Sequence, residues 1–208
     1  MQIQALPLGP LGANCYIVSD PDAGVCAVVD PGGAGGELAL RLERSGLRVA
    51  AIFLTHGHFD HVGGAAALRE ATGAPVYLSG ADRALPPDLT GGPLPETADL
   101  REGDAHAVGA VTFRVLATPG HSAGSVCLTV DDGEHRALLT GDTLFAGSCG
   151  RTDFPGGSTD ALMASLARLS ALEGNWPVLP GHGPASTLEE ERHSNPFLRQ
   201  AAAGEAQP

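Results

Sequence analysis

Lysine is absent from this sequence of 208 residues, so all twelve basic residues are Arg, against 24 Asp and Glu. A chain without Lys can form no lysine Schiff base and no P-loop, which needs its Lys to contact phosphates. Nucleic-acid binding relies on clustered Lys and Arg that release counterions from the phosphate backbone. Because the formal net charge is −12, we expect no nucleic-acid partner.

Long hydrophobic runs are also missing. No segment reaches the roughly 20 apolar residues of a membrane-spanning helix, and the N-terminal MQIQALPLGP has neither the basic start nor the apolar core of a signal peptide. We therefore expect a cytoplasmic protein without a membrane partner. The cysteines lack CxxC spacing, which favours reduced and mostly buried thiols over a disulfide framework; they are Cys15, Cys26, Cys127 and Cys149.

The composition indicates a folded globular chain, with 43% apolar and 17% charged residues. A chain of 208 residues can bury one sizeable core and is short for two. We expect a single domain over residues 1–200 and a flexible tail over residues 201–208. The sequence does not distinguish a monomer from a small homo-oligomer.

Apolar runs alternate with segments of helical spacing along the chain. A hairpin is predicted where β-rich runs at residues 11–18 and 25–30 flank SDPDAG, because Pro, Asp and Gly favour a turn. Residues 80–103 show no clear period and contain several prolines, so we expect a loop and a candidate pocket wall there. Further strands are expected at 49–55, 75–79, 111–117, 125–130, 136–140 and 176–179, and helices at 37–45, 62–72 and 159–172.

The motif THGHFDH, at residues 55–61, places three His and one Asp within seven positions. His56 and His58 are two apart, so both side chains can point the same way in an extended segment. Asp60 and His61 follow at the start of the next predicted helix. Imidazole nitrogens and a carboxylate suit zinc, iron or manganese, so two metal positions become available at this loop.

Three further motifs repeat this plan, each with a polar residue flanked by Gly after an apolar strand: TPGHSAGS, TGDTLF and LPGHGP. Strand ends of a layered α/β domain converge at one edge of the sheet. A structural metal site closes its shell with four ligands, often Cys, whereas this pattern offers seven, which favours a two-metal catalytic site. The candidates are His56, His58, Asp60, His61, His121, Asp142 and His182.

HxHxDH followed by single His, Asp and His resembles the metallo-β-lactamase superfamily over nearly the whole chain. VVDPGG, GDTLFAGSCGRTDFPGG, PGHGP and ERHSNPFL resemble the small, single-domain glyoxalase II-like (hydroxyacylglutathione hydrolase-like) metallohydrolases within it. The resemblance implies an α/β fold, the four-layer αβ/βα sandwich, with the site along one edge of the sheets. It also implies two metal positions bridged by Asp142, one held by His56, His58 and His121 and the other by Asp60, His61 and His182.

The implied cofactors are two divalent ions, with zinc favoured and iron or manganese open. Two cations about 3.5–4 Å apart can share a water and produce a hydroxide nucleophile, and they also polarise the substrate carbonyl. Asp60 would orient that hydroxide and move its proton. Because a metal can also stabilise a thiolate leaving group, we expect a dinuclear thioester hydrolase acting on S-lactoylglutathione or a related acyl thioester.

Arg151, in GSCGRTDF, matches the basic residue that glyoxalase II enzymes place against the glutathione part of their substrate. Its guanidinium would grip a substrate carboxylate with two hydrogen bonds; the alternative is a local ion pair with Asp153. Only 26 residues follow His182, where larger members of the family carry a helical domain that helps to hold glutathione. The sequence therefore leaves the thiol part of the substrate unnamed.

Two other functions stay open. CGRTDF also resembles the persulfide dioxygenases of the same superfamily, which use a single iron bound by two His and one Asp, although PGHGP favours the hydrolase. A non-catalytic metal-binding module is the remaining class. Exported β-lactamases commonly have Cys where Asp142 stands, and an RNA-processing nuclease would need a basic surface, so both are disfavoured.

Overall fold

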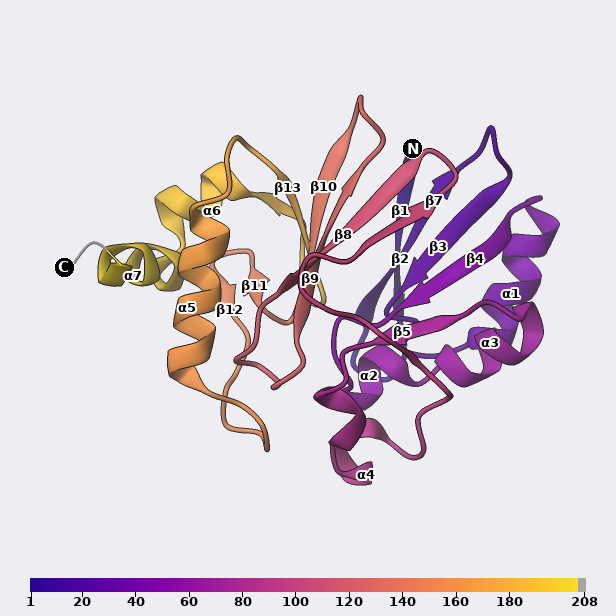
Figure 1. Ribbon diagram of the computed structural model, residues 1–208, viewed down its shortest axis with the longest axis horizontal. Helices are drawn as coiled ribbons and strands as arrows, with labels where there is room; N and C mark the ends of the chain where they lie inside the picture. Colours follow the sequence, from indigo (N-terminus) through magenta and orange to yellow (C-terminus); the bar gives the residue numbers. More distant parts are fainter. Residues whose placement is uncertain (206–208) are drawn as a thin grey trace.

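The computed structural model describes residues 1–205, and two six-stranded sheets face each other at its centre (Figure 1). The first sheet has the strand order β1-β2-β3-β4-β5-β6. Strands β1 to β3 are antiparallel neighbours, whereas β3 to β6 run parallel. The strands are β1 (Gln2–Leu8), β2 (Ala13–Asp20), β3 (Val25–Val29), β4 (Arg48–Phe53), β5 (Val76–Leu78) and β6 (Ala98–Asp99).

The second sheet has the order β14-β13-β10-β9-β8-β7. Strands β7 to β10 form an antiparallel meander, and β13 lies parallel to β10. A two-stranded ribbon, β11 and β12, follows β10. The strands are β7 (Ala105–Val108), β8 (Val111–Ala117), β9 (Val126–Asp131), β10 (Arg136–Gly141), β11 (Leu144–Phe145), β12 (Ser148–Cys149), β13 (Pro177–Pro180) and β14 (Ser186–Thr187).

Helices cover the outer face of each sheet and complete four layers (Figure 1). The helices α1 (Gly35–Arg44) and α3 (Ala65–Thr72) contribute to the apolar cluster on the first sheet. On the second sheet the corresponding cluster includes residues of α5 (Thr159–Ser170), α6 (Leu188–Ser194) and α7 (Pro196–Glu205). A third cluster fills the space between the sheets. The predicted αβ/βα sandwich is therefore confirmed.

Local chemistry explains where the longer helices lie. In α1 the buried residues Leu38, Ala39 and Leu42 recur at helical spacing, with Glu37 in the first turn and basic side chains in the last turn. Those charges oppose the partial charges of the helix ends. The helix α5 begins after Ser158, whose hydroxyl accepts a hydrogen bond from the backbone N–H of Ala161.

Most predicted elements agree with the structure, including the hairpin, which β2 and β3 form. The helix predicted over residues 62–72 differs, because it is divided into α2 (Phe59–Val62) and α3. A Cβ at Gly64 would lie 2.7 Å from the carbonyl oxygen of Pro31, so the chain breaks where it packs on the turn after β3. Residues 80–103 are not only loop: they contain the 3₁₀ helix η1 (Asp82–Ala84), α4 (Pro87–Thr90) and β6.

The predicted flexible tail is wrong for residues 201–205, because α7 continues to Glu205 and Ala201 is buried in the helical layer. Residues 206–208, the rest of that prediction, lie outside the described residues. The sequence analysis also missed β1, β7, α6 and α7. A signal for α6 was present, since Thr187 and Glu190 form a capping box at its start.

The strand directions bring the motifs to one edge of the sandwich. In the second sheet β8, β10 and β13 point the same way, because β9 is antiparallel to both of its neighbours and β13 is parallel to β10. THGHFDH follows β4 in the first sheet, and the other three motifs follow β8, β10 and β13. All four motifs thus leave the carboxyl ends of their strands.

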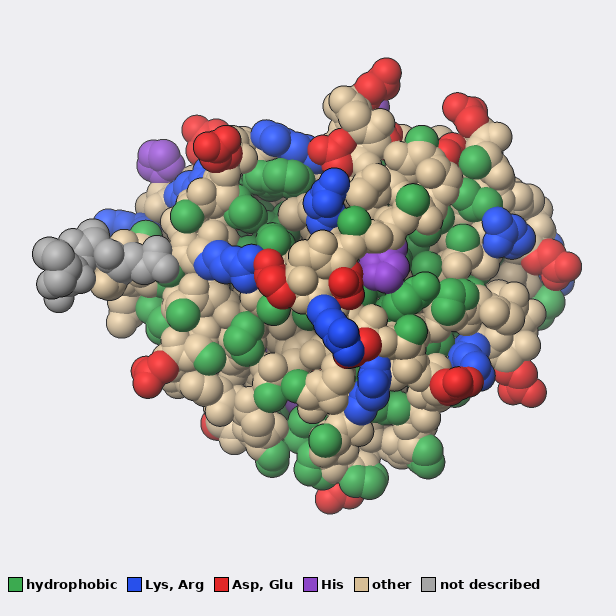
Figure 2. Space-filling model, viewed as in Figure 1, with side chains coloured by type: hydrophobic (Ala, Val, Ile, Leu, Met, Phe, Trp, Pro, Cys, Tyr) green, Lys and Arg blue, Asp and Glu red, His purple; other side chains and the backbone are tan. Residues whose placement is uncertain are grey.

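The surface in Figure 2 carries intermixed acidic and basic side chains with apolar side chains between them. Within the described chain, the exposed large hydrophobic side chains are Leu11, Leu40, Phe59 and Phe197. Two of these, Leu11 and Phe59, border one cavity. No described helix is long and apolar enough to span a membrane.

Gly32 lies in the turn after β3, packed against the backbone that carries Asp60. A Cβ at Gly32 would lie 1.8 Å from the Asp60 carbonyl oxygen. We expect Gly32→Ala to lower the free energy of unfolding by about 1–3 kcal/mol, the usual cost of overpacking, and to displace Asp60. Thermal unfolding measures this. Gly36→Ala is the control, since a Cβ there meets nothing within 4 Å and should keep or raise the Tm; equal Tm values would contradict the expectation.

Candidate metal centre

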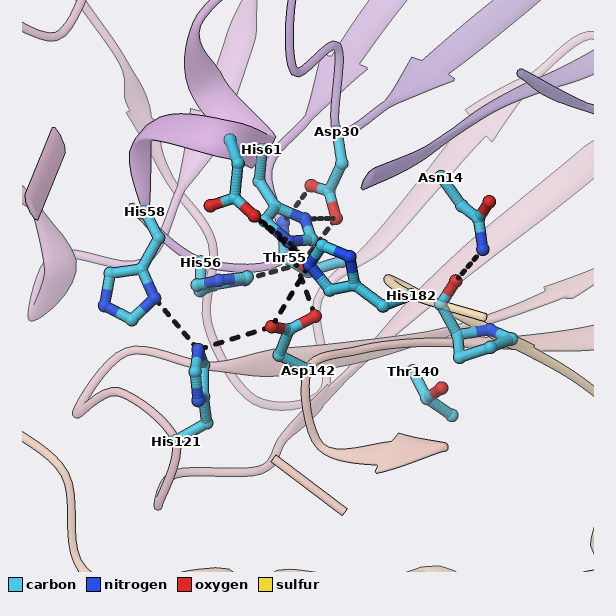
Figure 3. A network of polar contacts seen from close by, with 12 residues as sticks. Asn14, Asp30, Thr55, His56, His58, His61, His121, Thr140, Asp142 and His182 are labelled. Atoms are coloured by element: carbon cyan, nitrogen blue, oxygen red, sulfur yellow. Dashed lines mark hydrogen bonds and ion pairs between the residues drawn. The ribbon is translucent and has the colours of Figure 1, made fainter. Parts of the chain in front are cut away.

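The structure brings all seven predicted side chains together at one edge of the sheets, and Figure 3 labels all of them except Asp60. Six of them form two groups, and within each group the donor atoms lie within 4.8 Å of one another; a third group joins His56 and His61 to Asp30. One group comes from the loop after β4 and the loop after β8; the other combines the start of α2 with the loop after β13. The groups are His56, His58 and His121, and Asp60, His61 and His182.

Asp142 lies between these two groups. Its Oδ2 is 3.6 Å from Nε2 of His121 in the first group and 3.7 Å from Nε2 of His182 in the second. Its Oδ1 is 3.4 Å from Nε2 of His61. One carboxylate therefore faces both sets of imidazoles, as the resemblance to the superfamily implies for a bridging ligand.

The donor atoms fit divalent metal ions. Nε2 of His56 and Oδ1 of Asp142 are buried and have no hydrogen-bond partner within the described chain. Burying such atoms without a partner is unfavourable. Imidazole and carboxylate donors suit zinc, iron and manganese, so these residues can hold such ions.

Hydrogen bonds on the far side of two rings leave the inner nitrogens free to bind a metal. Nδ1 of His121 donates to the Arg151 carbonyl oxygen at 2.8 Å, which leaves Nε2 as the acceptor, 2.9 Å from Nδ1 of His58. Nδ1 of His56 lies 3.1 Å from Oγ1 of Thr55. Partners of this kind orient histidine ligands and set their tautomers.

Burial and charge divide the histidines by protonation. Burial lowers the pKa of His56 well below its usual value, and burial together with His121 lowers the pKa of His58 to about 4. Both imidazoles are therefore neutral near neutral pH, the form that can bind a metal ion. The hydrogen bond with Asp60 raises the pKa of His182, while Asp142 and Asp30 raise that of His61 against the effect of burial. Metal ions compete with protons at such positions.

Asp30 is a functional residue that the sequence analysis missed. It follows β3 and is 2% exposed. Its carboxylate accepts hydrogen bonds from the backbone N–H of Thr55 at 2.7 Å, from the Thr55 hydroxyl at 2.6 Å and from Nδ1 of His61 at 3.0 Å. Asp30 thereby supports one ligand directly and His56 through Thr55. The signal was present, since Asp30 is another polar residue directly after an apolar strand.

Asp82 is a second missed residue, and it joins the two histidine loops of the first group. This fully buried carboxylate accepts hydrogen bonds from the backbone N–H groups of Gly57 and Gly124, at 2.8 and 2.6 Å, and from the Ser122 hydroxyl at 2.7 Å. Gly57 lies between His56 and His58, while Ser122 follows His121 directly. No sequence signal pointed to Asp82, since its surroundings have no periodic pattern.

The His182 loop is held by the first sheet. Asn14 donates to the carbonyl oxygens of Pro180 and Gly183, and the Tyr16 hydroxyl donates to that of Pro180. Figure 3 shows Asn14 beside this loop. The adjoining Gly181 has no room for a side chain, because a Cβ there would lie 2.3 Å from Oδ1 of Asp142. One strand of the opposite sheet, β2, therefore positions His182.

Arg151 lines a cavity of about 600 Å³ that opens onto the metal centre. Its side chain is engaged locally, since Nε and Nη2 donate to the two carboxylate oxygens of Asp153, both at 2.6 Å. The guanidinium also lies 4.0 Å from the ring centroid of Phe154. Of the two partners that the sequence left open for Arg151, the structure shows the local ion pair with Asp153. The four cysteines are free, as predicted.

A two-sheet sandwich that gathers His and Asp donors at one edge is the arrangement of a metallo-hydrolase. The sequence model of the metallo-beta-lactamase superfamily matches residues 8–185. The chain belongs to this superfamily, whose members bind divalent metals.

Relatives include enzymes with named activities. The probable metallo-hydrolase YqgX of Bacillus subtilis is 38% identical over 210 residues, covering 95% of this chain and 98% of the relative. The hydroxyacylglutathione hydrolase GloC of Haemophilus influenzae is 33% identical, with the same coverage of both chains. The hydroxyacylglutathione hydrolase of Ectopseudomonas mendocina is 38% identical, but the match covers 88% of this chain and 65% of that longer protein.

Solved structures show the same fold. The BLEG-1 B3 metallo-beta-lactamase has a TM-score of 0.83 at 38% identity, covering 95% of this chain and 99% of that one. TTHA1623 in a di-iron-bound form has a TM-score of 0.80 at 40% identity, with coverages of 93% and 99%. ETHE1 from Myxococcus xanthus has a TM-score of 0.79 at 28% identity, with coverages of 97% and 90%.

Replacing Asp142 with Ala tests the bridge. Because this carboxylate faces both donor groups, we expect Asp142→Ala to lower the metal content from about two ions per chain to well below one, measured by elemental analysis after metal loading. Asp88→Ala is the control, since Asp88 lines the same cavity and stands outside both donor groups. An Asp142→Ala variant that retains both ions would exclude a bridging role.

Proposed function

We propose that this protein is a dinuclear metal-dependent hydrolase of thioesters, of the glyoxalase II type. The observation that carries the proposal is the position of Asp142, within 3.7 Å of imidazole nitrogens from both donor groups. A carboxylate shared in this way supports two metal ions rather than one. We propose that both ions are zinc. Relatives at 33–38% identity that are named hydroxyacylglutathione hydrolases support the thioester as substrate.

The bound metals would supply a water of lowered pKa and polarise the substrate carbonyl. We assign Asp60 the task of orienting the attacking water and taking its proton. Its Oδ2 lies 3.1 Å from Nε2 of His182 and 3.6 Å from Nε2 of His61, and hydrogen bonding to His182 holds its pKa below the usual value although burial opposes this. Asp60 is therefore a carboxylate at neutral pH and able to accept a hydrogen bond.

The thiol part of the substrate remains a separate proposal. The match to the Ectopseudomonas mendocina enzyme leaves about a third of that protein uncovered, whereas GloC is covered over 98% of its length. Because GloC is covered almost completely and bears the name hydroxyacylglutathione hydrolase, the uncovered third of the longer enzyme does not argue against glutathione. We propose a carboxylate-bearing thiol, glutathione among the candidates.

A paired assay on metal-loaded protein tests this function. We expect thiol release from S-lactoylglutathione, no oxygen uptake with glutathione persulfide, and close to two metal ions per chain. Asp60→Asn is expected to lower kcat by about 100-fold or more while KM changes little and both ions are retained. Oxygen uptake with one iron per chain would identify a dioxygenase, and full metal content without turnover of any substrate would identify a binding module.

We propose that Arg151 releases Asp153 when substrate binds and pairs with the substrate carboxylate instead. Arg151→Ala is then expected to raise KM for an anionic thioester by up to about 5-fold, the range of an exposed ion pair, with kcat nearly unchanged. Neutral thioesters should be unaffected. Asp153→Asn is the matched control, because it frees the guanidinium and should lower KM for the anionic substrate. A lower Tm with equal effects on all substrates would make the ion pair purely structural.

A further inference from the structure

The cavity beside the metal centre has an apolar wall. Besides the ligands, it is lined by five large apolar side chains, and its volume is about 600 Å³, within the range of small-molecule sites. Aromatic residues make up only 4% of the chain, yet three of its six Phe lie here. The apolar residues are Leu11, Phe59, Leu89, Phe145 and Phe154.

Two of these side chains are exposed to solvent at the rim of the cavity. Leu11, in the turn between β1 and β2, is 59% exposed, and Phe59, the first residue of α2, is 38% exposed. Exposed apolar side chains that gather on one concave surface mark a binding site more often than scattered ones do. The fold does not need this exposure, since its three core clusters are complete without Leu11 and Phe59.

The apolar wall begins at the ligands themselves. The Phe154 ring lies edge-on to His58, with 5.4 Å between centroids, and the Phe145 ring lies edge-on to His182 at 6.2 Å. These histidines belong to different donor groups. A substrate whose carbonyl is held between the groups therefore lies beside two phenyl rings, one next to each donor group.

The charges at this wall do not favour an acidic acyl group. Of the charged side chains that line the cavity outside the donor set, Asp88 is negative, and Arg151 is already assigned to the carboxylate of the thiol part of the substrate. A second carboxylate on the acyl group would meet Asp88 and find no unpaired cation among the lining residues. The wall can therefore recognise the acyl group only through apolar contacts.

We propose that this wall binds the acyl group of the substrate. The preferred substrates are then thioesters whose acyl group is an apolar alkyl chain longer than two carbons or an aryl group, rather than short hydroxyacyl thioesters. The inference rests on the proposed thioester hydrolysis and specifies its substrate class. Each methylene that leaves water for the wall is worth about a fourfold gain at most, and an open rim gives somewhat less.

The test uses neutral thioesters of N-acetylcysteamine with acetyl, butyryl, hexanoyl, octanoyl and benzoyl groups, so that the leaving thiol stays constant. For the metal-loaded protein we expect kcat/KM to rise about two- to fourfold per methylene from acetyl to hexanoyl. Leu11→Gln keeps the side-chain size and removes its apolar character, and should flatten that rise. Leu40→Gln is the matched control, since Leu40 is 53% exposed on α1 and lines a different surface.

A second readout does not depend on turnover. The S-octyl thioether of N-acetylcysteamine cannot be hydrolysed, and it should raise the Tm of wild type and Leu40→Gln more than that of Leu11→Gln. Equal kcat/KM across the acyl series, or a Leu11→Gln variant identical to wild type in both measurements, would overturn the acyl site while leaving thioester hydrolysis intact. If the metal-loaded protein hydrolyses none of the thioesters, the proposed function and this substrate class are overturned together.

Discussion

The buried carboxylate of Asp30 is the interaction on which the metal centre depends. Its three hydrogen bonds, two from Thr55 and one from His61, connect the end of β3 to the end of β4 and to α2. A buried carboxylate that lost these partners would be strongly destabilising. Asp30 makes these contacts with a left-handed backbone, at φ 51°, a conformation that is costly for a residue other than Gly and persists where the surrounding structure holds it.

The inner site and its rim follow different physical rules. The ligands lie at strand ends and are fixed by buried hydrogen bonds, because a metal site tolerates little displacement of its donors. Part of the cavity wall comes instead from segments that carry no donor, such as the turn with Leu11 and the short helix α4 with Leu89. Segments of this kind can change without moving the donors, so one metal centre can serve substrates of different shape.

The sequence by itself determined the candidate ligand set and the longer elements that lead into the four motifs. HxHxDH is a local pattern, and each later ligand follows an apolar run that forms a strand, so the parallel directions of β8, β10 and β13 were enough to bring His121, Asp142 and His182 to one edge. Capping and periodicity act within a few residues, and for that reason α1, α5 and the strands before the four motifs could be predicted. The start of α6 could have been predicted by the same rules, because its capping box is a local pattern.

Tertiary structure alone decided what supports those ligands and what surrounds them. Asp82 acts on Gly57 and Gly124, 25 and 42 residues away, and nothing in residues 80–103 marks it. The break between α2 and α3 comes from the contact of Gly64 with Pro31, and the apolar wall joins side chains from five separate segments. The sequence left Arg151 with two possible partners, a substrate or Asp153, and the folded chain shows the pair with Asp153. Contacts between distant segments depend on how whole layers pack, which no local pattern encodes.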